Sequence, residues 1–475
     1  MTVRRDLIVL GGGPAGASAA IEAAALGLDT VLIDEGRDAG GQVYRPPSAA
    51  LASVSASPDK QLGDELRKRL HASKVDCRFD RRAWMLERGF RVSCLGVEGP
   101  EEFEAEALIV ATGAQERHIP LPGWTLPGVI GLAAATLLLK AEKVLPGRRV
   151  VVAGTGPLLY LVAAGILEGG GEVAAVVDLN GRSDWLTALP AMLSRPDLLW
   201  RGLSWTAKLQ LRGIPIHYRS AVRRIEGKEG VEAVICGPVD DTGRPLPGAE
   251  FRFDADALGL GFGLMPTTET TRRLGAEHRY DEAQGGWAVE TDADRRTSIP
   301  KLYACGDGAG VLGAAAAPIG GRIAALAAAR DLGRIDASEF DRRTGSLKED
   351  FARAARFGGA MTALANPGQR AVELMTADSL LCRCEGLTRA EIERAVTAGS
   401  RSLVDLKAAT RCGMGPCGGR ICSEAASMLI AAQGKMARSD IPPATARPPL
   451  RPVPLGIIAG DFDYSDLPHL PPGPL

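Results

Sequence analysis

The chain has 475 residues, which is too long for one hydrophobic core, so two or three domains are expected. Its 45% hydrophobic and 24% charged residues are typical of a globular protein and exclude a disordered or fibrous one. With 56 basic and 57 acidic residues the net charge is -1, which gives no electrostatic attraction to nucleic acid.

The first residues, MTVRRDLIVLGGG, predict a strand and not a targeting segment, because the short apolar run opens directly into glycines. The longest apolar runs, such as 158–167, are shorter than the roughly 18 residues that a membrane span needs. No transmembrane segment is therefore expected. Four scattered cysteines favour small buried side chains in a reduced, cytoplasmic protein: Cys77, Cys94, Cys236 and Cys305.

A dinucleotide-binding turn is predicted close to the N-terminus. Residues 6–10 predict a strand, 17–26 a helix and 30–33 a second strand. The turn between the first two follows the G-x-G-x-x-G pattern, with Gly11, Gly13, Pro14, Ala15 and Gly16. Asp34 and Glu35 follow the second strand, where an acidic residue binds ribose hydroxyls. The pyrophosphate is expected at the helix N-terminus.

A second unit of the same plan is predicted over residues 148–178, which implies two doubly wound α/β domains. Its turn has Gly154 and Gly156, but Leu159 stands where the third glycine belongs. Asp178 still follows the second strand. Three interpretations are open: a retained fold without a cofactor, NAD(P)H binding, or an adenine nucleotide (ATP or NAD(P)) with a structural or regulatory role.

Five cysteines lie between residues 382 and 422, and four of them predict an iron–sulfur site: Cys382, Cys384, Cys412 and Cys417. Thr388-x-x-Glu391 predicts the start of a helix after the first pair, and another helix is expected after the second pair. Cys422 is placed inside that second helix and is expected to pack there without binding metal. Structural zinc is the alternative, but the single residue between Cys382 and Cys384 disfavours it. No Cys-x-x-Cys pair occurs in residues 1–375, which disfavours a disulfide reductase.

Three further motifs resemble the two-dinucleotide-binding-domain flavoproteins: Gly40-Gly41-Gln42, Ala111-Thr112-Gly113, and Leu302 to Gly306-Asp307. This resemblance implies FAD in the first domain. It places Asp307 at the ribityl or pyrophosphate part of FAD and Thr112-Gly113 on the adenine side. The cysteine spacing resembles the bacterioferritin-associated-ferredoxin-like domain, which implies a [2Fe-2S] cluster.

The combination of these motifs resembles the large (alpha or A) subunit of heteromeric amine and imino-acid dehydrogenases, such as opine oxidases, proline dehydrogenases and hydrogen cyanide synthase. The resemblance implies electron transfer to an acceptor from a FAD-dependent, amine-oxidase-like beta subunit. It leaves open membrane association through partners, which could include a small [2Fe-2S] gamma subunit. The rival interpretations are a self-sufficient NAD(P)H-dependent reductase and a nucleotide-binding scaffold or regulatory subunit.

The predicted fold class is α/β with the second Rossmann-like domain inserted in the first and a small helical iron–sulfur domain added. The expected boundaries are 1–120 with 285–375 for the FAD-binding domain, 121–284 for the NAD(P)-binding-like domain, 376–436 for the [2Fe-2S] domain, and 437–475 for a proline-rich tail. The prolines of the tail predict neither helix nor central strand.

Overall fold

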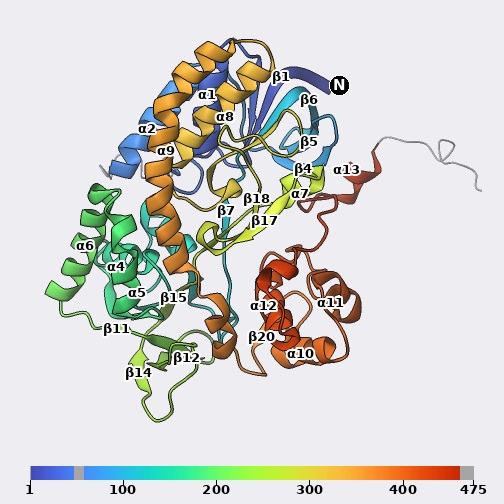
Figure 1. The fold of residues 1–475 in the computed structure, drawn as a ribbon. Helices are drawn as coiled ribbons and strands as arrows, with labels where there is room; N and C mark the ends of the chain where they lie inside the picture. The colour runs from blue at the N-terminus through green and yellow to red at the C-terminus, as the bar shows by residue number, and fades with distance from the viewer. Residues whose placement is uncertain (1, 48–57, 461–475) are drawn as a thin grey trace, which may run out of the picture.

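The computed structural model describes residues 2–47 and 58–460 (Figure 1). The first domain is built on a seven-stranded sheet in which β1, β2, β3, β6 and β19 run parallel and β4 and β5 form an antiparallel extension. Its strands are β1 (Thr2–Leu10), β2 (Thr30–Ile33), β3 (Asp76–Arg78), β4 (Arg82–Glu87), β5 (Arg91–Gly96), β6 (Gly99–Val110) and β19 (Leu302–Ala304). Because β19 joins this sheet only after the second domain is complete, the predicted insertion is confirmed.

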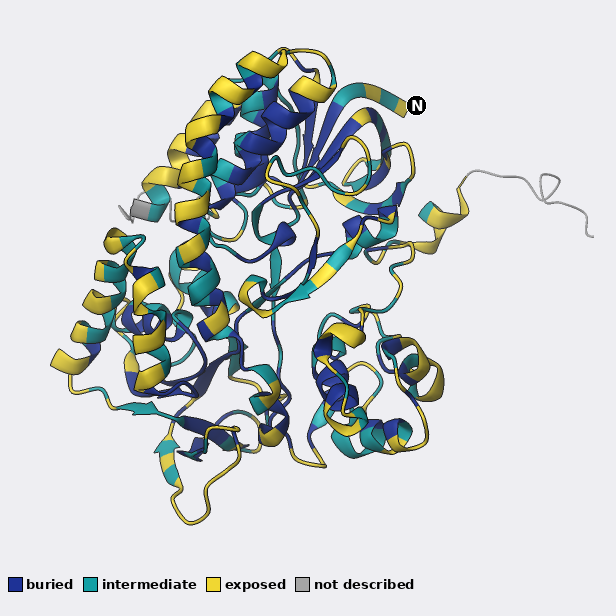
Figure 2. Ribbon diagram, in the orientation of Figure 1, coloured by how far each residue is buried: buried dark blue, intermediate teal, exposed yellow. Residues whose placement is uncertain are grey.

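Helices cover the first sheet: α1 (Pro14–Ala25), α2 (Pro58–His71), α8 (Ala317–Asp331) and the first part of α9 (Ala337–Ala365). α1 and α8 are rich in alanine and glycine, which lets their backbones approach closely. A Cβ built on Gly321 would lie 2.0 Å from the carbonyl oxygen of Ala15. The sheet core beneath them is fully buried, including Leu7, Ile8 and Val9 (Figure 2). This packing fixes the carboxyl ends of β1, β6 and β19 relative to one another.

The second domain has a five-stranded parallel sheet in the order β11-β10-β9-β15-β8. Its strands are β8 (Val129–Gly131), β9 (Arg149–Gly154), β10 (Glu172–Asp178), β11 (Ile216–Tyr218) and β15 (Ala257–Gly261), and its helices are α3 (Leu132–Leu137), α4 (Leu158–Glu168), α5 (Arg182–Met192) and α6 (Pro196–Leu211). An antiparallel sheet of β12 (Ser220–Glu226), β13 (Ala233–Pro238) and β14 (Phe251–Asp254) lies beside it. Two short strands connect the domains, β7 (Ala114–Glu116) and β16 (Leu264–Pro266).

The long helix α9 runs from the first domain down to the second, as Figure 1 shows. It has 29 residues, and Asp336 caps its N-terminus, because the Asp336 side chain accepts a hydrogen bond from the backbone N–H of Glu339. At about 1.5 Å per residue such a helix spans roughly 40 Å, enough to reach across both domains. α7 (Glu269–Leu274), β17 (His278–Asp281) and β18 (Gly286–Val289) lie in the connection that returns to β19.

A third, helical unit contains the five clustered cysteines, and we call it the cysteine domain. It consists of β20 (Leu380–Cys382), β21 (Leu387–Thr388), α10 (Arg389–Thr397), α11 (Leu403–Thr410) and α12 (Ser423–Gly434). The capping box of Thr388 and Glu391 that the sequence predicts is present at the start of α10. The Trp124 indole N–H donates to the carbonyl of Leu380 at 2.8 Å. This hydrogen bond joins the cysteine domain to the first two domains, which together we call the body.

The proline-rich tail crosses back from the cysteine domain to the first domain. The backbone N–H of Leu450 donates to the carbonyl of Trp84 at 2.7 Å, and the Leu450 side chain is buried. The expectation that the tail contains no helix is wrong for one turn, α13 (Leu455–Ala459), which follows Pro454 and so places proline outside the helical hydrogen bonds. Residues 461–475 of the predicted tail lie outside the described residues. Among the helices that are described, none is long and apolar enough to cross a membrane.

Candidate functional site

The first glycine turn joins β1 to α1, and packing alone requires two of its glycines. Gly11 has a φ of 108°, and a Cβ there would lie 2.4 Å from the carbonyl oxygen of Ala111. A Cβ on Gly16 would lie 1.8 Å from the carbonyl oxygen of Gly11. Pro14 and Ala15 are the buried first residues of α1. Any side chain at Gly11 or Gly16 would therefore push the helix away from the strand.

At Gly13, in contrast, no neighbouring protein atom would clash with a Cβ. Its φ is -65°, and a Cβ would meet only the Cα of Gly41, at 4.0 Å. The turn at Gly40 and Gly41 lies against it, since the Gly40 N–H donates to the carbonyl of Gly12 at 2.8 Å. Gln42 follows in the same turn and is exposed. A side chain on Gly13 would fill the space before the α1 N-terminus, where backbone N–H groups and the helix dipole attract phosphate. The turn thus fits the pyrophosphate of a dinucleotide.

The structure distinguishes the two acidic residues after β2. The Asp34 carboxylate accepts hydrogen bonds from the backbone N–H groups of Gly12 at 2.5 Å and Gly36 at 2.6 Å. Burial raises its pKa, and these two hydrogen bonds act in the opposite direction. Glu35 is exposed and forms an ion pair with Arg451 of the tail, at 3.8 Å. Asp34 is therefore the residue that faces the glycine turn.

The motifs at Ala111 to Gly113 and at Gly306-Asp307 lie side by side because β6 and β19 are parallel neighbours that end at the same edge. The Thr112 hydroxyl donates to the carbonyl of Thr267 at 3.2 Å. Asp307 accepts from the backbone N–H groups of residues 312 and 313, at 3.0 and 2.8 Å, and burial raises its pKa. These residues, with the first glycine turn, form one continuous candidate dinucleotide site.

The second glycine turn is covered by the C-terminal end of α9. A Cβ built on Gly156 would lie 2.6 Å from the Cβ of Ala365, and one on Gly154 would lie 1.7 Å from the carbonyl oxygen of Gly261. The Thr155 hydroxyl donates to the carbonyl of Ala365 at 2.6 Å. The position where a bound dinucleotide would approach the Gly156 backbone is thus held by the chain itself. Leu159, on α4, is fully buried in the hydrophobic core of the second domain.

Asp178, the ribose-binding candidate of the second domain, is fully buried and already hydrogen-bonded. Its carboxylate accepts from the Tyr160 hydroxyl, the Trp185 indole N–H and the Asn180 backbone N–H, each at 3.0 Å. Burial raises its pKa to about 7. The Asn180 side chain in turn donates to the carbonyl of Leu364, at the end of α9, at 2.7 Å. These contacts join the second nucleotide site to α9.

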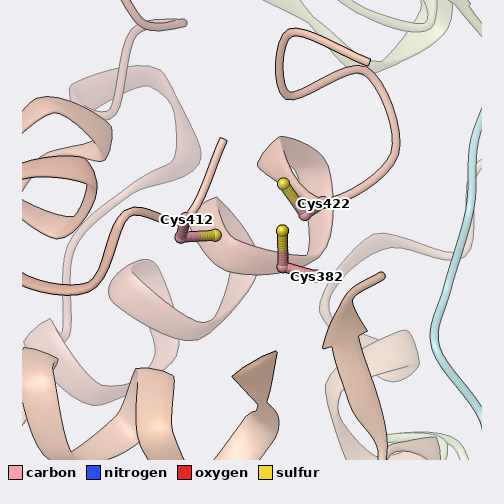
Figure 3. A group of neighbouring side chains, drawn as sticks. All are labelled: Cys382, Cys412 and Cys422. Carbon is pink, nitrogen blue, oxygen red and sulfur yellow. The ribbon is translucent and has the colours of Figure 1, made fainter. Parts of the chain in front are cut away.

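Three cysteine sulfurs converge in the cysteine domain, and all three lie within 4.8 Å of one another: Cys382, Cys412 and Cys422 (Figure 3). Cys382 ends β20, Cys412 lies in the glycine-rich loop after α11, and all three residues are buried. The backbone N–H groups of Gly413 and Glu385 donate to the Cys382 sulfur. Buried sulfurs that receive backbone N–H groups suit an anionic metal centre.

The placement of Cys422 inside a helix was wrong. α12 begins at Ser423, and Cys422 is its N-cap residue, so the thiol faces the other cysteines and not a helix neighbour. Two glycines with positive φ, Gly418 and Gly419, delay the start of the helix, and sequence reasoning underestimated that delay.

Cys384 and Cys417 form a second contact in the same domain. Their thiols interact, and the Cys417 backbone N–H also donates to the Cys384 sulfur. Gly415 makes room for this contact, because a Cβ there would lie 2.1 Å from the Cβ of Cys384. The Cys422 thiol contacts those of Cys382 and Cys412, and it interacts electrostatically with that of Cys417. Cys382, Cys412 and Cys422 therefore form one group of sulfurs, and Cys384 and Cys417 form a second contact that interacts with it electrostatically.

The four scattered cysteines are unsuited to redox chemistry. Burial raises the pKa of Cys77 to about 11 and that of Cys94, Cys236 and Cys305 to about 12, so these thiols stay protonated at neutral pH.

An ion network that no sequence motif indicated joins the cysteine domain to the body. The Arg117 guanidinium is buried and donates to the carbonyls of Phe262 at 2.9 Å and Gly285 at 2.7 Å. It also pairs at 3.2 Å with Glu424, in the first turn of α12, and Glu424 pairs with Arg438 at 2.8 Å. Arg117 is a single residue that follows the connecting strand β7, so only the folded chain reveals its partners.

Comparison with known proteins agrees with both halves of this site. Residues 5–333 match the family described as pyridine nucleotide-disulphide oxidoreductase, and residues 380–432 match the BFD-like [2Fe-2S] binding domain. The chain is 36% identical to the hydrogen cyanide synthase protein HcnB of Pseudomonas aeruginosa, over 94% of this chain and 97% of that protein. It is 35% identical to the A subunit of opine oxidase from Rhizobium meliloti, over 96% and 98% respectively. The fold is similar to that of L-proline dehydrogenase from P.horikoshii, with a TM-score of 0.68 at 19% identity, over 97% of this chain and 80% of that one.

Proposed function

The chain belongs to the pyridine nucleotide-disulphide oxidoreductase family and is a relative of HcnB and of the opine oxidase A subunit. From that premise we propose that it is the electron-transfer subunit of a heteromeric amine, opine or imino-acid dehydrogenase. In this proposal a FAD-dependent, amine-oxidase-like partner subunit oxidises the C–N bond of the substrate. This chain conducts the electrons onward to an acceptor.

The observation that carries the proposal is the cover that α9 places on the second glycine turn. Ala365 occupies the approach to Gly156, and Asp178 has three donors of its own. A pyridine nucleotide bound in the usual way needs both the glycine backbone and the acidic residue. The same contacts count against an adenine nucleotide in that turn. A self-sufficient NAD(P)H-dependent reductase is therefore the weaker interpretation.

The family implies FAD and a [2Fe-2S] cluster, and the residues of this chain fit both. The first glycine turn, Asp34 and the Asp307 loop would hold the dinucleotide, and the clustered thiols would hold the iron. FAD supplies the exchange between two-electron and one-electron chemistry, and the cluster supplies one-electron transfer. The protein contributes the positions of these groups, and it buries Cys382 and Cys422 while Cys384 is exposed.

For the ligands, we propose Cys382, Cys384, Cys417 and Cys422. Cys384 contacts Cys417 and Cys422 contacts Cys382, and electrostatic interactions of Cys417 with Cys422 and of Cys382 with Cys384 link the two pairs; we call these four cysteines the ring. Cys412 touches this ring only on the side of Cys422 and Cys382. The expectation from spacing alone was Cys412 in the place of Cys422, and one experiment distinguishes the two sets.

Single serine variants with iron and sulfide analysis provide that experiment. Cys422→Ser should lose the cluster, whereas Cys412→Ser and the control Cys305→Ser, far from the ring, should keep it. Loss in the Cys412→Ser variant with retention in Cys422→Ser would restore the set expected from the spacing. Zinc in place of iron in the wild-type protein would refute the iron–sulfur assignment altogether.

The function itself is tested by anaerobic mixing. NADH and NADPH should leave the flavin absorbance of the isolated chain unchanged over a catalytic time, while dithionite should bleach it and prove that the flavin is reducible. Addition of an opine or proline-like amine, together with the amine-oxidase-like partner protein, should then reduce a dye or quinone acceptor. Rapid bleaching by NADH alone would favour the reductase.

A further inference from the structure

A cavity of about 110 Å³ lies between the cysteine domain and the flavin-binding body. One wall is the connection β7–β16 with the start of α7, the second is the loop 418–420 with the start of α12, and the third is the tail at 441–444. This volume suits a small ion or one group of a larger ligand, because sites for whole drug-sized ligands measure about 300 Å³ or more.

Three arginines are among the residues that line the cavity. Arg272, Arg420 and Arg438 reach it directly, and their ion-pair partners bring in Arg117 and Arg451. Within the part of the chain that the structure describes, the ion pairs of these five arginines involve three carboxylates, those of Glu35, Glu269 and Glu424. Two positive charges are thus left without a matching carboxylate in a largely buried place.

Arg438 points most directly to a ligand. Its side chain is only 8% exposed and its guanidinium lies over the Tyr280 ring, 5.6 Å from the centroid, yet its Nε and Nη1 atoms have no hydrogen-bond partner among the described residues. Its remaining nitrogen donates to Glu424 at 2.8 Å. A buried guanidinium with two unused donors is costly unless an acceptor completes it.

The other two arginines already have partners that keep them in place. Arg272 donates to the Thr268 hydroxyl at 3.1 Å and to the carbonyl of Ala444, and burial lowers its pKa in spite of the nearby Glu269. Arg420 donates to the carbonyl of Cys417 at 2.9 Å and to Glu269 at 2.7 Å. Arg420 therefore joins the cavity to the cysteine ring.

We propose that this cavity binds a phosphate group, as inorganic phosphate or as the phosphate of a nucleoside monophosphate. A phosphate dianion matches the two unbalanced positive charges and offers acceptors to the unused Arg438 donors. A bound phosphate would connect Arg272 of α7, Arg420 of the loop before α12 and Arg438 at the start of the tail. The site is separate from the candidate FAD turn at Gly13 and goes beyond the proposed electron-transfer role.

The test uses the full chain with FAD and cluster in place, so that the flavin site is occupied. Calorimetric titration with inorganic phosphate, at constant ionic strength, should show saturable binding of one phosphate per chain. Arg438→Gln should weaken it about 10- to 100-fold, in line with the loss of charge-assisted hydrogen bonds. Arg438→Lys should keep more of the binding, and Arg356→Gln, an exposed arginine of α9, should leave it unchanged.

A second variant guards against misfolding of Arg438→Gln. Thr268 is the N-cap residue of α7, where aspartate is well tolerated, so Thr268→Asp should fold and yet neutralise Arg272. It should also weaken phosphate binding. Adenosine monophosphate that binds at least tenfold more tightly than phosphate would identify a nucleotide as the source, and equal binding would identify free phosphate.

The proposal is overturned if neither compound shows saturable binding to the wild-type protein, if succinate binds in their place, or if both cavity variants bind phosphate like the wild type. Flavin content and cluster absorbance are recorded on the same samples. A failure of phosphate binding is thereby distinguished from a failure of the electron-transfer proposal, which is measured by acceptor reduction.

Discussion

Replacing Gly13 by alanine should separate FAD binding from folding. The added Cβ would meet only the Cα of Gly41, at 4.0 Å, and the backbone has a φ of -65° that alanine adopts readily. The stability of the apoprotein should therefore change by no more than about 1 kcal/mol, the usual difference between glycine and alanine at a helix N-cap. The methyl group would nevertheless stand where the pyrophosphate approaches the backbone.

The expected loss of FAD affinity follows from the hydrogen bonds at that position. If the methyl group displaces the pyrophosphate from one charge-assisted backbone hydrogen bond, the cost is about 1.5–3 kcal/mol. This corresponds to an increase in Kd of roughly 10- to 150-fold. Fluorescence titration of the apoprotein with FAD measures the change in Kd, and thermal unfolding of the same apoprotein measures stability.

Gly16→Ala is the matched comparison, because a Cβ there would lie 1.8 Å from the carbonyl oxygen of Gly11. This variant should lose stability even without FAD, by about 3 kcal/mol or more, since the helix must move away from the strand. The reasoning is refuted if Gly13→Ala binds FAD like the wild type, or if it destabilises the apoprotein as much as Gly16→Ala does.

Three further predictions concern the rest of the molecule. Arg117→Met should lower the free energy of unfolding by about 3–5 kcal/mol, because it removes one of the two ion-pair partners of Glu424 and the donor of two buried carbonyls. Arg195→Ala, in a partly exposed pair, should cost less than about 1 kcal/mol, and equal shifts in thermal unfolding would contradict this reasoning. Because burial raises the pKa of Asp178 to about 7, its protonated form stabilises the native state below about pH 4, and this contribution is lost as the pH rises through 7. The stability advantage of the wild type over Asp178→Asn should accordingly shrink between about pH 5 and pH 8, and parallel pH profiles would disprove it. Leu450→Asp should detach the tail from Trp84 and speed proteolytic cleavage near residue 450, with Leu455→Asp, which is 83% exposed, as the neutral control.

The sequence was informative wherever a structural feature is local. The strand 30–33 matches β2 residue for residue, and the capping box at Thr388 starts α10, because a short run of apolar residues or a single side-chain hydrogen bond decides each of them. The first glycine turn is equally local. Its spacing, its strand and its helix all lie within about 25 residues, so one stretch of sequence predicts the whole arrangement.

The sequence was uninformative where distant segments meet. Ala365 lies more than 200 residues after Gly156, and no pattern in either segment predicts that one covers the other. The same holds for Arg117 and Glu424. Cys422 was misplaced for a different reason: helix boundaries are uncertain by a residue or two, and here one residue decides whether a thiol faces the cluster.

Because the tail packs back on the first domain, the cysteine domain is attached to the rest of the protein at both of its ends. One is the entry segment, which the Trp124 side chain holds at Leu380, and the other is the exit segment, which is anchored at Leu450 on the edge of the first sheet. A domain attached at one end can swing, as electron carriers on flexible arms do, and its encounter with a redox partner then depends on linker length. With both ends fixed, the domain is restricted to small rotations about the line that joins its anchors. The distance between the sulfur ring and the first domain is then set by the fold, and the electron transfer that we propose for this chain should proceed at a rate that solvent viscosity does not change.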